Sequence, residues 1–234
     1  MFIPLHDDNA LKRISYQYVT ISLIALNVLV YLIEASGLDE GAIRSFAVTP
    51  RALMAGTLFS TPAPTSEGAL PVVEGMTLLT YMFFHADIFH LAGNMLFLWV
   101  FGDNVEDAMG HVKFLFFYLA CGVFAGLFHA WMVPDSDAPL IGASGAVAGV
   151  IAAYLMLHPR VGVWILAFKV IPLRISAGLA LGLWILLQVA MVALSGSGPT
   201  AWWAHIGGLL AGAALILVLR RPGVPLFDKG TKLA

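Results

Sequence analysis

The sequence has few charged residues and almost no cysteine. Charged side chains make up 11% of its 234 residues, against roughly 25% in soluble domains. This scarcity excludes an ordinary soluble globule. The single cysteine, Cys121, excludes an intramolecular disulfide. A net charge of −2 without any run of basic residues gives no reason to expect a nucleic-acid partner.

The N-terminal segment lacks the pattern of a cleavable signal peptide. Residues 1–17 are polar and include two acidic residues before any long apolar run begins. We therefore expect residues 1–17 to form a short cytoplasmic segment, and the first apolar helix to direct membrane insertion itself.

Apolar residues, in contrast, make up 60% of the chain. They gather in blocks of about 20, the length at which a helix crosses a hydrocarbon core of about 30 Å. The predicted spanning helices are 18–35, 83–102, 112–133, 142–157, 175–194 and 201–219. This pattern predicts an all-α, polytopic membrane protein, with a six-helix domain over residues 18–220. A long first loop at 36–79 and a short cytoplasmic tail at 221–234 complete the chain.

The stretch 161–194 is long enough for two short helices, but Lys169, Pro172 and Arg174 interrupt it. A charge near the bilayer centre costs about 2.5 to 3.5 kcal/mol on insertion scales. We therefore predict an interfacial segment at 161–173 and one spanning helix after it.

The basic residues predict the orientation, because Lys and Arg are enriched in cytoplasmic loops. With six helices, only Arg44 and Arg51 of the 12 basic residues fall on the face opposite the two termini. The prediction is an integral, multi-pass protein with both termini inside. Seven helices would place the basic tail outside and are the weaker alternative.

Polar side chains inside membrane helices are expensive and need a partner or a function. Three groups of them stand at the outer starts of the second, fourth and sixth predicted helices, and hence at similar depth. They are His85, His90 and Asn94 in the second, Ser144 in the fourth and His205 in the sixth. Asp87, the acidic residue nearest the start of the second helix, is interpreted as a partner of the helix dipole.

Small residues follow Ser144 and His205 at helical spacing, which favours close packing of the two helices. They are Gly145, Ala148, Gly149 and Ala152 in the fourth helix, and Gly208 and Gly212 in the sixth. If these stripes face one another, the imidazole comes within reach of the hydroxyl and can activate it as a nucleophile. A lone membrane serine usually bonds a backbone carbonyl, but the matched placement favours a catalytic pair. Because no acidic residue lies centrally in a span, we predict a dyad without a carboxylate.

Together these motifs resemble the rhomboid family of intramembrane serine proteases. The resemblance runs from the second predicted helix to the sixth. His90 and Asn94 form the family's His-x-x-x-Asn element, with His85 as the preceding histidine. The other two motifs are Gly142-Ala-Ser144-Gly145 and Ala204-His205-Ile-Gly-Gly208-Leu-Leu-Ala-Gly212.

The resemblance implies a water-filled cavity open to the outer side, and cleavage of single-span membrane proteins near that surface. It implies membrane lipid as surroundings, a bacterial inner membrane as location, and neither a metal nor a cofactor. It assigns His90, Asn94 and the backbone N–H of Ser144 to an oxyanion site, which agrees with the donors that an amide and a helix N-terminus provide. The supporting residues are His85, Gly142, Gly145, Gly208 and Gly212. For His85 we expect a hydrogen bond to the first loop.

Two positions depart from the family pattern. Many members carry Trp-Arg in the first loop, yet this chain has no tryptophan before Trp99. Some members stack an aromatic residue on the histidine, and Ala148 stands at that position here. The base must be oriented otherwise, with Trp202, Trp203 or Gln188 as candidates, although an aromatic belt at the interface is the simpler interpretation of the two tryptophans.

Two other functions remain open from the sequence. His85, His90 and His205 could supply three zinc ligands, although no His-Glu-x-x-His element accompanies them. A non-catalytic protein that binds membrane segments, or a transporter with the same polar cavity, is the second alternative.

Overall fold

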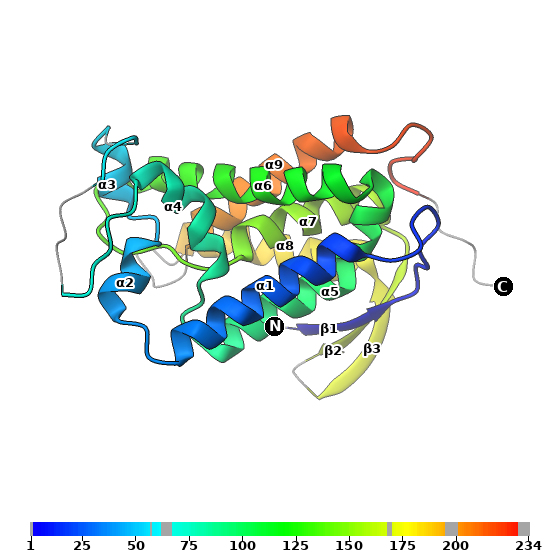
Figure 1. Ribbon diagram of the computed structural model, residues 1–234. Coiled ribbons are helices and arrows are strands. Elements are labelled where there is room, and N and C mark those ends of the chain that lie inside the picture. The colour runs from blue at the N-terminus through cyan, green and yellow to red at the C-terminus, as the bar shows by residue number, and fades with distance from the viewer. Residues whose placement is uncertain (1, 57, 62–66, 168–169, 195–200, 229–234) are drawn as a thin grey trace.

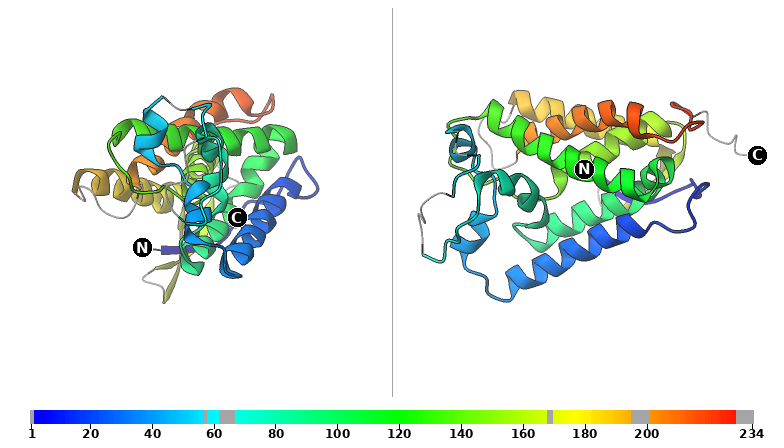
Figure 2. Two further views of the ribbon diagram at one scale, coloured as in Figure 1. Left: turned by 60° about the vertical axis from the view of Figure 1, so that its left-hand side comes forward. Right: turned by 45° about the horizontal axis from the view of Figure 1, so that its top comes forward.

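The computed structural model describes residues 2–56, 58–61, 67–167, 170–194 and 201–228. Its long helices lie side by side, with connecting segments at both ends of the bundle (Figures 1 and 2). They are α1 (Tyr18–Ala35), α5 (Ile88–Met109), α6 (His111–Met132), α7 (Ser144–Leu157), α8 (Ala177–Leu194) and α9 (Trp202–Leu219). All six predicted helices are therefore present, which confirms the polytopic helical bundle.

By length and apolarity, four of the helices in the described part of the chain are able to cross a membrane: α1, α6, α8 and α9. A fifth candidate consists of α4 (Glu74–Thr80) and η1 (Tyr81–Phe83) followed by α5, with a bend of 83° between the two parts. The remaining helix, α7, has 14 residues, about 21 Å at a rise of 1.5 Å per residue. Most of its residues are buried, so this short helix is surrounded mainly by the other helices of the bundle.

Acidic residues at one end of α5 hold the start of α1. Glu106, which is fully buried, accepts hydrogen bonds from the backbone N–H of Val19 and Thr20 at 3.0 and 2.8 Å, and from the Thr20 hydroxyl at 2.7 Å. These N–H groups belong to the first turn of α1, where no intrahelical acceptor is available. The carboxylate thus satisfies them and complements the positive end of the helix dipole.

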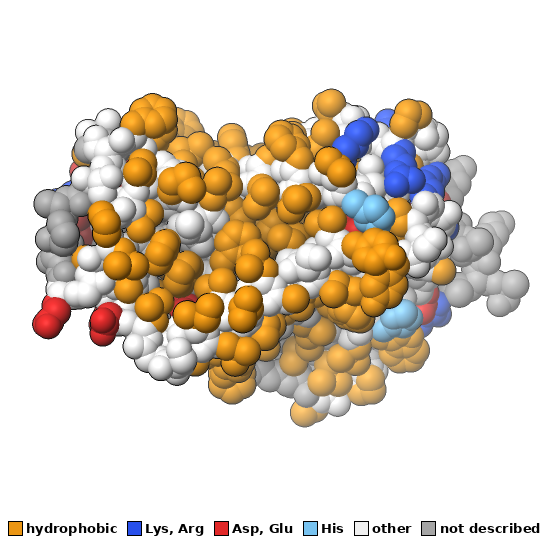
Figure 3. Space-filling view, in the orientation of Figure 1, with side chains coloured by type: hydrophobic (Ala, Val, Ile, Leu, Met, Phe, Trp, Pro, Cys, Tyr) orange, Lys and Arg blue, Asp and Glu red, His pale blue; other side chains and the backbone are white. Residues whose placement is uncertain are grey.

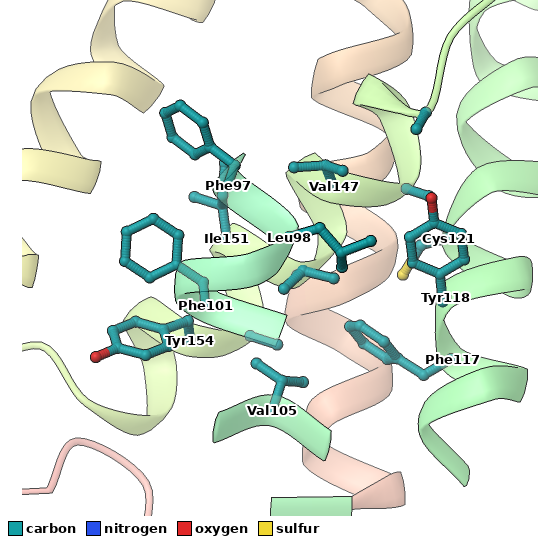
Figure 4. Packing of buried hydrophobic residues seen from close by; sticks show 14 of the residues in the cluster. Phe97, Leu98, Phe101, Val105, Phe117, Tyr118, Cys121, Val147, Ile151 and Tyr154 are labelled. Atoms are coloured by element: carbon teal, nitrogen blue, oxygen red, sulfur yellow. The ribbon is translucent and has the colours of Figure 1, made fainter. Parts of the chain in front are cut away.

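The core lies where α5, α6 and α7 meet. Figure 4 shows Leu98 and Phe101 of α5 beside Phe117 of α6 and Ile151 and Tyr154 of α7. All five side chains have essentially no exposed surface. The outer surface of α8, in contrast, carries exposed leucines, as expected where a helix faces lipid. Apolar side chains also cover much of the face in Figure 3, and Lys and Arg gather at the end near the C-terminal segment.

A three-stranded antiparallel sheet accompanies the helices and was not predicted. Its strands are β1 (Phe2–Asp7), β2 (Gly162–Ala167) and β3 (Ile171–Ser176), in the order β1-β2-β3. Most of the segment 161–173 is thus a hairpin between α7 and α8, and part of the expected N-terminal segment is its partner strand (Figure 1). The short apolar run of β2 does not by itself distinguish a strand from a buried helix. Lys169 lies outside the described residues.

The predicted long first loop contains two short helices, α2 (Glu40–Ser45) and α3 (Pro50–Met54), and most of α4. A backbone bridge between Val48 and Leu140 ties this loop to the segment that precedes α7. The Pro-, Ser- and Thr-rich stretch 59–71 falls within this loop. The described part, residues 59–61 and 67–71, has neither helix nor strand, and residues 62–66 lie outside the description.

Candidate active site

Ser144 is the first residue of α7, and the chain reaches it through a left-handed turn. Gly142 has φ = +119°, a conformation that a side chain disfavours. A Cβ at this position would also lie 2.6 Å from Cε1 and 2.8 Å from Nε2 of His90. Glycine is therefore required twice, once by the turn and once by the close approach of the imidazole.

Ser144 and His205 are joined by a hydrogen bond. The Ser144 Oγ lies 2.8 Å from Nε2 of His205, within the ordinary range for a hydroxyl that donates to nitrogen. His205 lies in the first turn of α9 and is 9% exposed. The structure thus brings together the two residues predicted to form the dyad.

Glycines make this contact possible by letting α7 and α9 approach each other closely. A Cβ at Gly208 would overlap the carbonyl oxygen of Gly145, and one at Gly212 would overlap the backbone of Gly149. The predicted stripes do face one another. Their backbones touch where any larger side chain would separate the helices.

The second nitrogen of His205 contacts Gln188 on α8. Its Nδ1 lies 2.7 Å from Oε1 of Gln188, a side chain with 3% exposure. The Trp202 ring meets the imidazole edge-on at 5.8 Å between centroids. Trp203, the third candidate for this role, packs on Phe128 instead. Sequence reasoning missed Trp184, whose ring lies 6.1 Å from that of His205.

Asn94 and His90 are one turn apart on α5. Asn94 is 7% exposed, and among the described residues its Nδ2 has no hydrogen-bond partner. The ring of His90 lies against Gly142, two residues before Ser144. The helix that carries both residues is capped by Asp87, whose carboxylate accepts from the N–H groups of Phe89 and His90. This cap agrees with the interpretation of Asp87 as a helix-dipole partner.

His85 takes a different position from the one expected. Among the described residues of the first loop, none is hydrogen-bonded to its ring. Nε2 accepts from the N–H of Ala143 at 3.4 Å, and the ring lies 5.2 Å from that of His90. The link toward α1 is made by the His85 backbone N–H, which points at the Glu34 carboxylate. His85 therefore supports the turn before Ser144.

The three histidines proposed above as zinc ligands do not form such a group. Over the ranges that the structure describes, no three His, Cys, Asp or Glu side chains are arranged to hold a metal ion. His85 and His90 are neighbours, whereas the ring nitrogens of His205 are hydrogen-bonded to Ser144 and Gln188.

Fold and site together define a class: a multi-pass helical membrane protein in which a serine at a helix N-terminus is hydrogen-bonded to a buried histidine. Comparison with protein families identifies the group within this class. The family model described as the rhomboid domain matches residues 73–222, more than half of the chain. The chain belongs to the rhomboid family.

Several curated proteins are similar to this chain. The human presenilin-associated rhomboid-like protein, mitochondrial, is 28% identical over 206 residues, which cover 84% of this chain and 47% of that protein. Rhomboid protein 1, mitochondrial, of Saccharomyces cerevisiae is 28% identical over 151 residues, or 60% of this chain and 41% of that protein. RHOMBOID-like protein 12, mitochondrial, of Arabidopsis thaliana is 29% identical over 153 residues, or 58% and 44%. The chain thus matches less than half the length of these relatives. Their names place them in mitochondria and do not support the expected bacterial inner membrane.

Proposed function

We propose that this protein is an intramembrane serine endopeptidase, with Ser144 as nucleophile and His205 as general base and acid. The observation that carries the proposal is the 2.8 Å contact between Ser144 Oγ and His205 Nε2. Membership of the rhomboid family supports an intramembrane protease in general terms. The assignment of residues rests on the geometry described above.

The proposed reaction proceeds in two steps. Nε2 of His205 takes the proton of the Ser144 hydroxyl as Oγ attacks the carbonyl carbon of the scissile peptide. The imidazolium then gives this proton to the leaving amine, the peptide C–N bond breaks, and an acyl ester remains on Ser144. In the second step water attacks the ester, His205 accepts the proton of that water and returns it to Oγ, and the new carboxyl group leaves.

The negative charge that develops on the carbonyl oxygen of the scissile peptide must be stabilised by hydrogen-bond donors. We assign this role to the Asn94 side chain, the His90 ring and the backbone N–H of Ser144. The absence of a partner for Asn94 Nδ2 among the described residues supports the assignment, because a buried donor is normally satisfied. The N–H of Ser144 belongs to the first turn of α7, where N–H groups are free to bind an anion.

The proposed substrates are single-span membrane proteins, cut near the outer side of the bilayer. We also propose that both termini lie inside. The starts of α7 and α9, which carry Ser144 and His205, then face the outer side. The side of the bundle that receives Arg44 and Arg51 is the less basic one, which supports this orientation under the positive-inside rule.

A fluorophosphonate probe tests the proposal without knowledge of the substrate. Purified wild-type protein is expected to be labelled, Ser144→Ala not at all, and His205→Ala at a strongly reduced rate. Exposed residues of the same types supply matched controls, Ser36→Ala and His6→Ala, which should react as the wild type does. Asn94→Ala should slow cleavage of a single-span reporter by about 100- to 1,000-fold, the usual loss for one oxyanion donor.

The alternatives lead to different outcomes of the same experiment. A folded wild-type protein that is never labelled and cuts no reporter would favour the non-catalytic binder or transporter. Reporter cleavage that persists in Ser144→Ala but stops with a chelator would favour a metal-dependent hydrolase.

A further inference from the structure

Gln188 is a buried polar residue on the lipid-facing helix α8. Only 22% of the α8 span is buried within the protein, yet Gln188 is 3% exposed. An amide buried in this way must be hydrogen-bonded, since an unsatisfied polar group in the hydrocarbon region is expensive. Its side-chain oxygen meets Nδ1 of His205 at 2.7 Å.

The orientation of this amide follows from its second contact. The Gln188 Nε2 donates to the carbonyl oxygen of Trp184 at 3.4 Å, one turn earlier on α8. A carbonyl oxygen only accepts, so the amide nitrogen must face it. Oε1 is thereby left to point at His205.

This orientation selects the useful tautomer of the imidazole. Gln188 Oε1 is an acceptor, so Nδ1 of His205 must carry a proton to bond it. In the neutral ring Nε2 is then unprotonated and is able to receive the proton of the Ser144 hydroxyl. The other tautomer would place a proton on Nε2, where the ring is no base toward the serine.

We propose that Gln188 is a positioning residue, which fixes the tautomer and the ring plane of His205 and completes a Ser144–His205–Gln188 relay. The inference rests on the proposed function and deepens it. Gln188 occupies the place where soluble serine proteases have a carboxylate, but a neutral amide avoids the cost of burying a charge there. It also makes the alignment of the base depend on α8.

Aromatic contacts also connect α8 to the neighbouring helices. Besides the bond from Gln188, the Trp184 ring lies 6.1 Å from the rings of both His205 and Phe97 of α5. At the same level Trp184 and Ile185 of α8 also pack against Ala148, Ala152 and Leu209 of α7 and α9. A shift of α8 by about 1 Å would stretch the bond to Nδ1 beyond hydrogen-bond length.

The test compares Gln188→Leu, which removes the acceptor, with Gln188→Glu, which keeps an acceptor oxygen. Fluorophosphonate labelling of Ser144 is measured as a rate against pH. We expect Gln188→Leu to slow labelling about 10- to 100-fold, by analogy with the loss seen when the partner that orients a metal-binding histidine is removed. Gln188→Glu should recover most of this loss. In the Gln188→Glu variant the acidic limb of the plot of labelling rate against pH should move to higher pH, because a neighbouring carboxylate favours the protonated imidazole of His205.

Leu187→Met is the matched control, since Leu187 is adjacent on α8 and 44% exposed. It should label as the wild type does. ¹⁵N NMR of histidine-labelled protein, with the His205 signals identified by their loss in His205→Ala, reports the tautomer directly. We expect a protonated Nδ1 in the wild type and a mixture of tautomers in Gln188→Leu.

The outcomes separate this inference from the proposed function. A wild type labelled at Ser144, together with an equally reactive Gln188→Leu, would overturn the positioning role alone. So would a Gln188→Glu variant as slow as Gln188→Leu, because that result indicates a packing defect. If the wild type showed no labelling that depends on Ser144, both the proposed function and this inference would be refuted.

Discussion

Gly208→Ala adds one methyl group where α9 touches α7. Its Cβ would lie 2.9 Å from the carbonyl carbon of Gly145 and 3.2 Å from Cβ of Ala148, and it would overlap the Gly145 oxygen. These neighbours are backbone and a short side chain, so none of them can rotate away. The two helices must separate.

The required separation can be compared with the tolerance of the site. Carbon atoms pack best at about 3.5 to 4.0 Å, so α9 must move by about 1 Å. The bond from Ser144 to His205 is 2.8 Å long and tolerates only a few tenths of an ångström before it is lost. A misplacement of about 1 Å costs roughly 100-fold in rate. Overpacking costs about 1 to 3 kcal/mol of stability, of which the better helix propensity of alanine offsets about 0.5 to 1 kcal/mol.

The assay is the rate of fluorophosphonate labelling, accompanied by thermal unfolding in detergent. Gly182→Ala on α8 is the matched control, since a Cβ at that position meets no atom within 4 Å. We expect the control to label normally and Gly208→Ala to lose about 100-fold in rate while still folded. If Gly208→Ala reacted at the wild-type rate, close glycine packing would not be what aligns the dyad.

Two further predictions concern stability. Glu106→Gln should lower the unfolding temperature in detergent, since one amide cannot accept the four contacts that the buried carboxylate makes with Val19, Thr20 and His111. The expected loss of stability is about 1 to 3 kcal/mol. It should exceed the loss in Glu40→Gln, which affects only an exposed ion pair with Arg44, and equal losses would contradict the prediction. For Asp7, burial raises the pKa to about 7 from the model-compound value of 3.8. The protonated Asp7 therefore contributes up to about 4 kcal/mol to the free energy of unfolding, fully present below pH 4 and lost as the pH rises to 7. Stability measured from pH 5 to 8 should thus fall more in the wild type than in Asp7→Asn. Parallel curves for the two proteins would refute this.

The ends of α5 show why helix boundaries were only partly predictable. The prediction was 83–102, and the helix is Ile88–Met109. Hydropathy stopped the prediction at Asp103, because a charge normally ends a membrane segment. The helix continues because Glu106 accepts hydrogen bonds from the first turn of α1, and Asp107 accepts them from the N–H groups of Arg13 and Ile14 in the segment before α1. These partners lie 86 to 94 positions away in the chain.

The sheet illustrates a second limit. Phe2 pairs with Ala167, and no local pattern specifies a partner that is so distant in sequence. The run around Val163 is apolar enough for either a strand or a short helix. The choice is made when the N-terminal segment provides the second strand.

The sequence by itself predicted the helices and the two residues, Ser144 and His205, that we propose as the dyad. Helical hydrogen bonds are local and lipid demands long apolar runs, so the presence of the helices could be predicted although their exact ends could not, and the glycines marked the faces that would meet. Only the tertiary structure decided what surrounds the pair: that Gln188 and not Trp203 reaches His205, and that His85 supports Ala143. Such contacts join side chains from separate helices, and their distances depend on how the whole bundle packs.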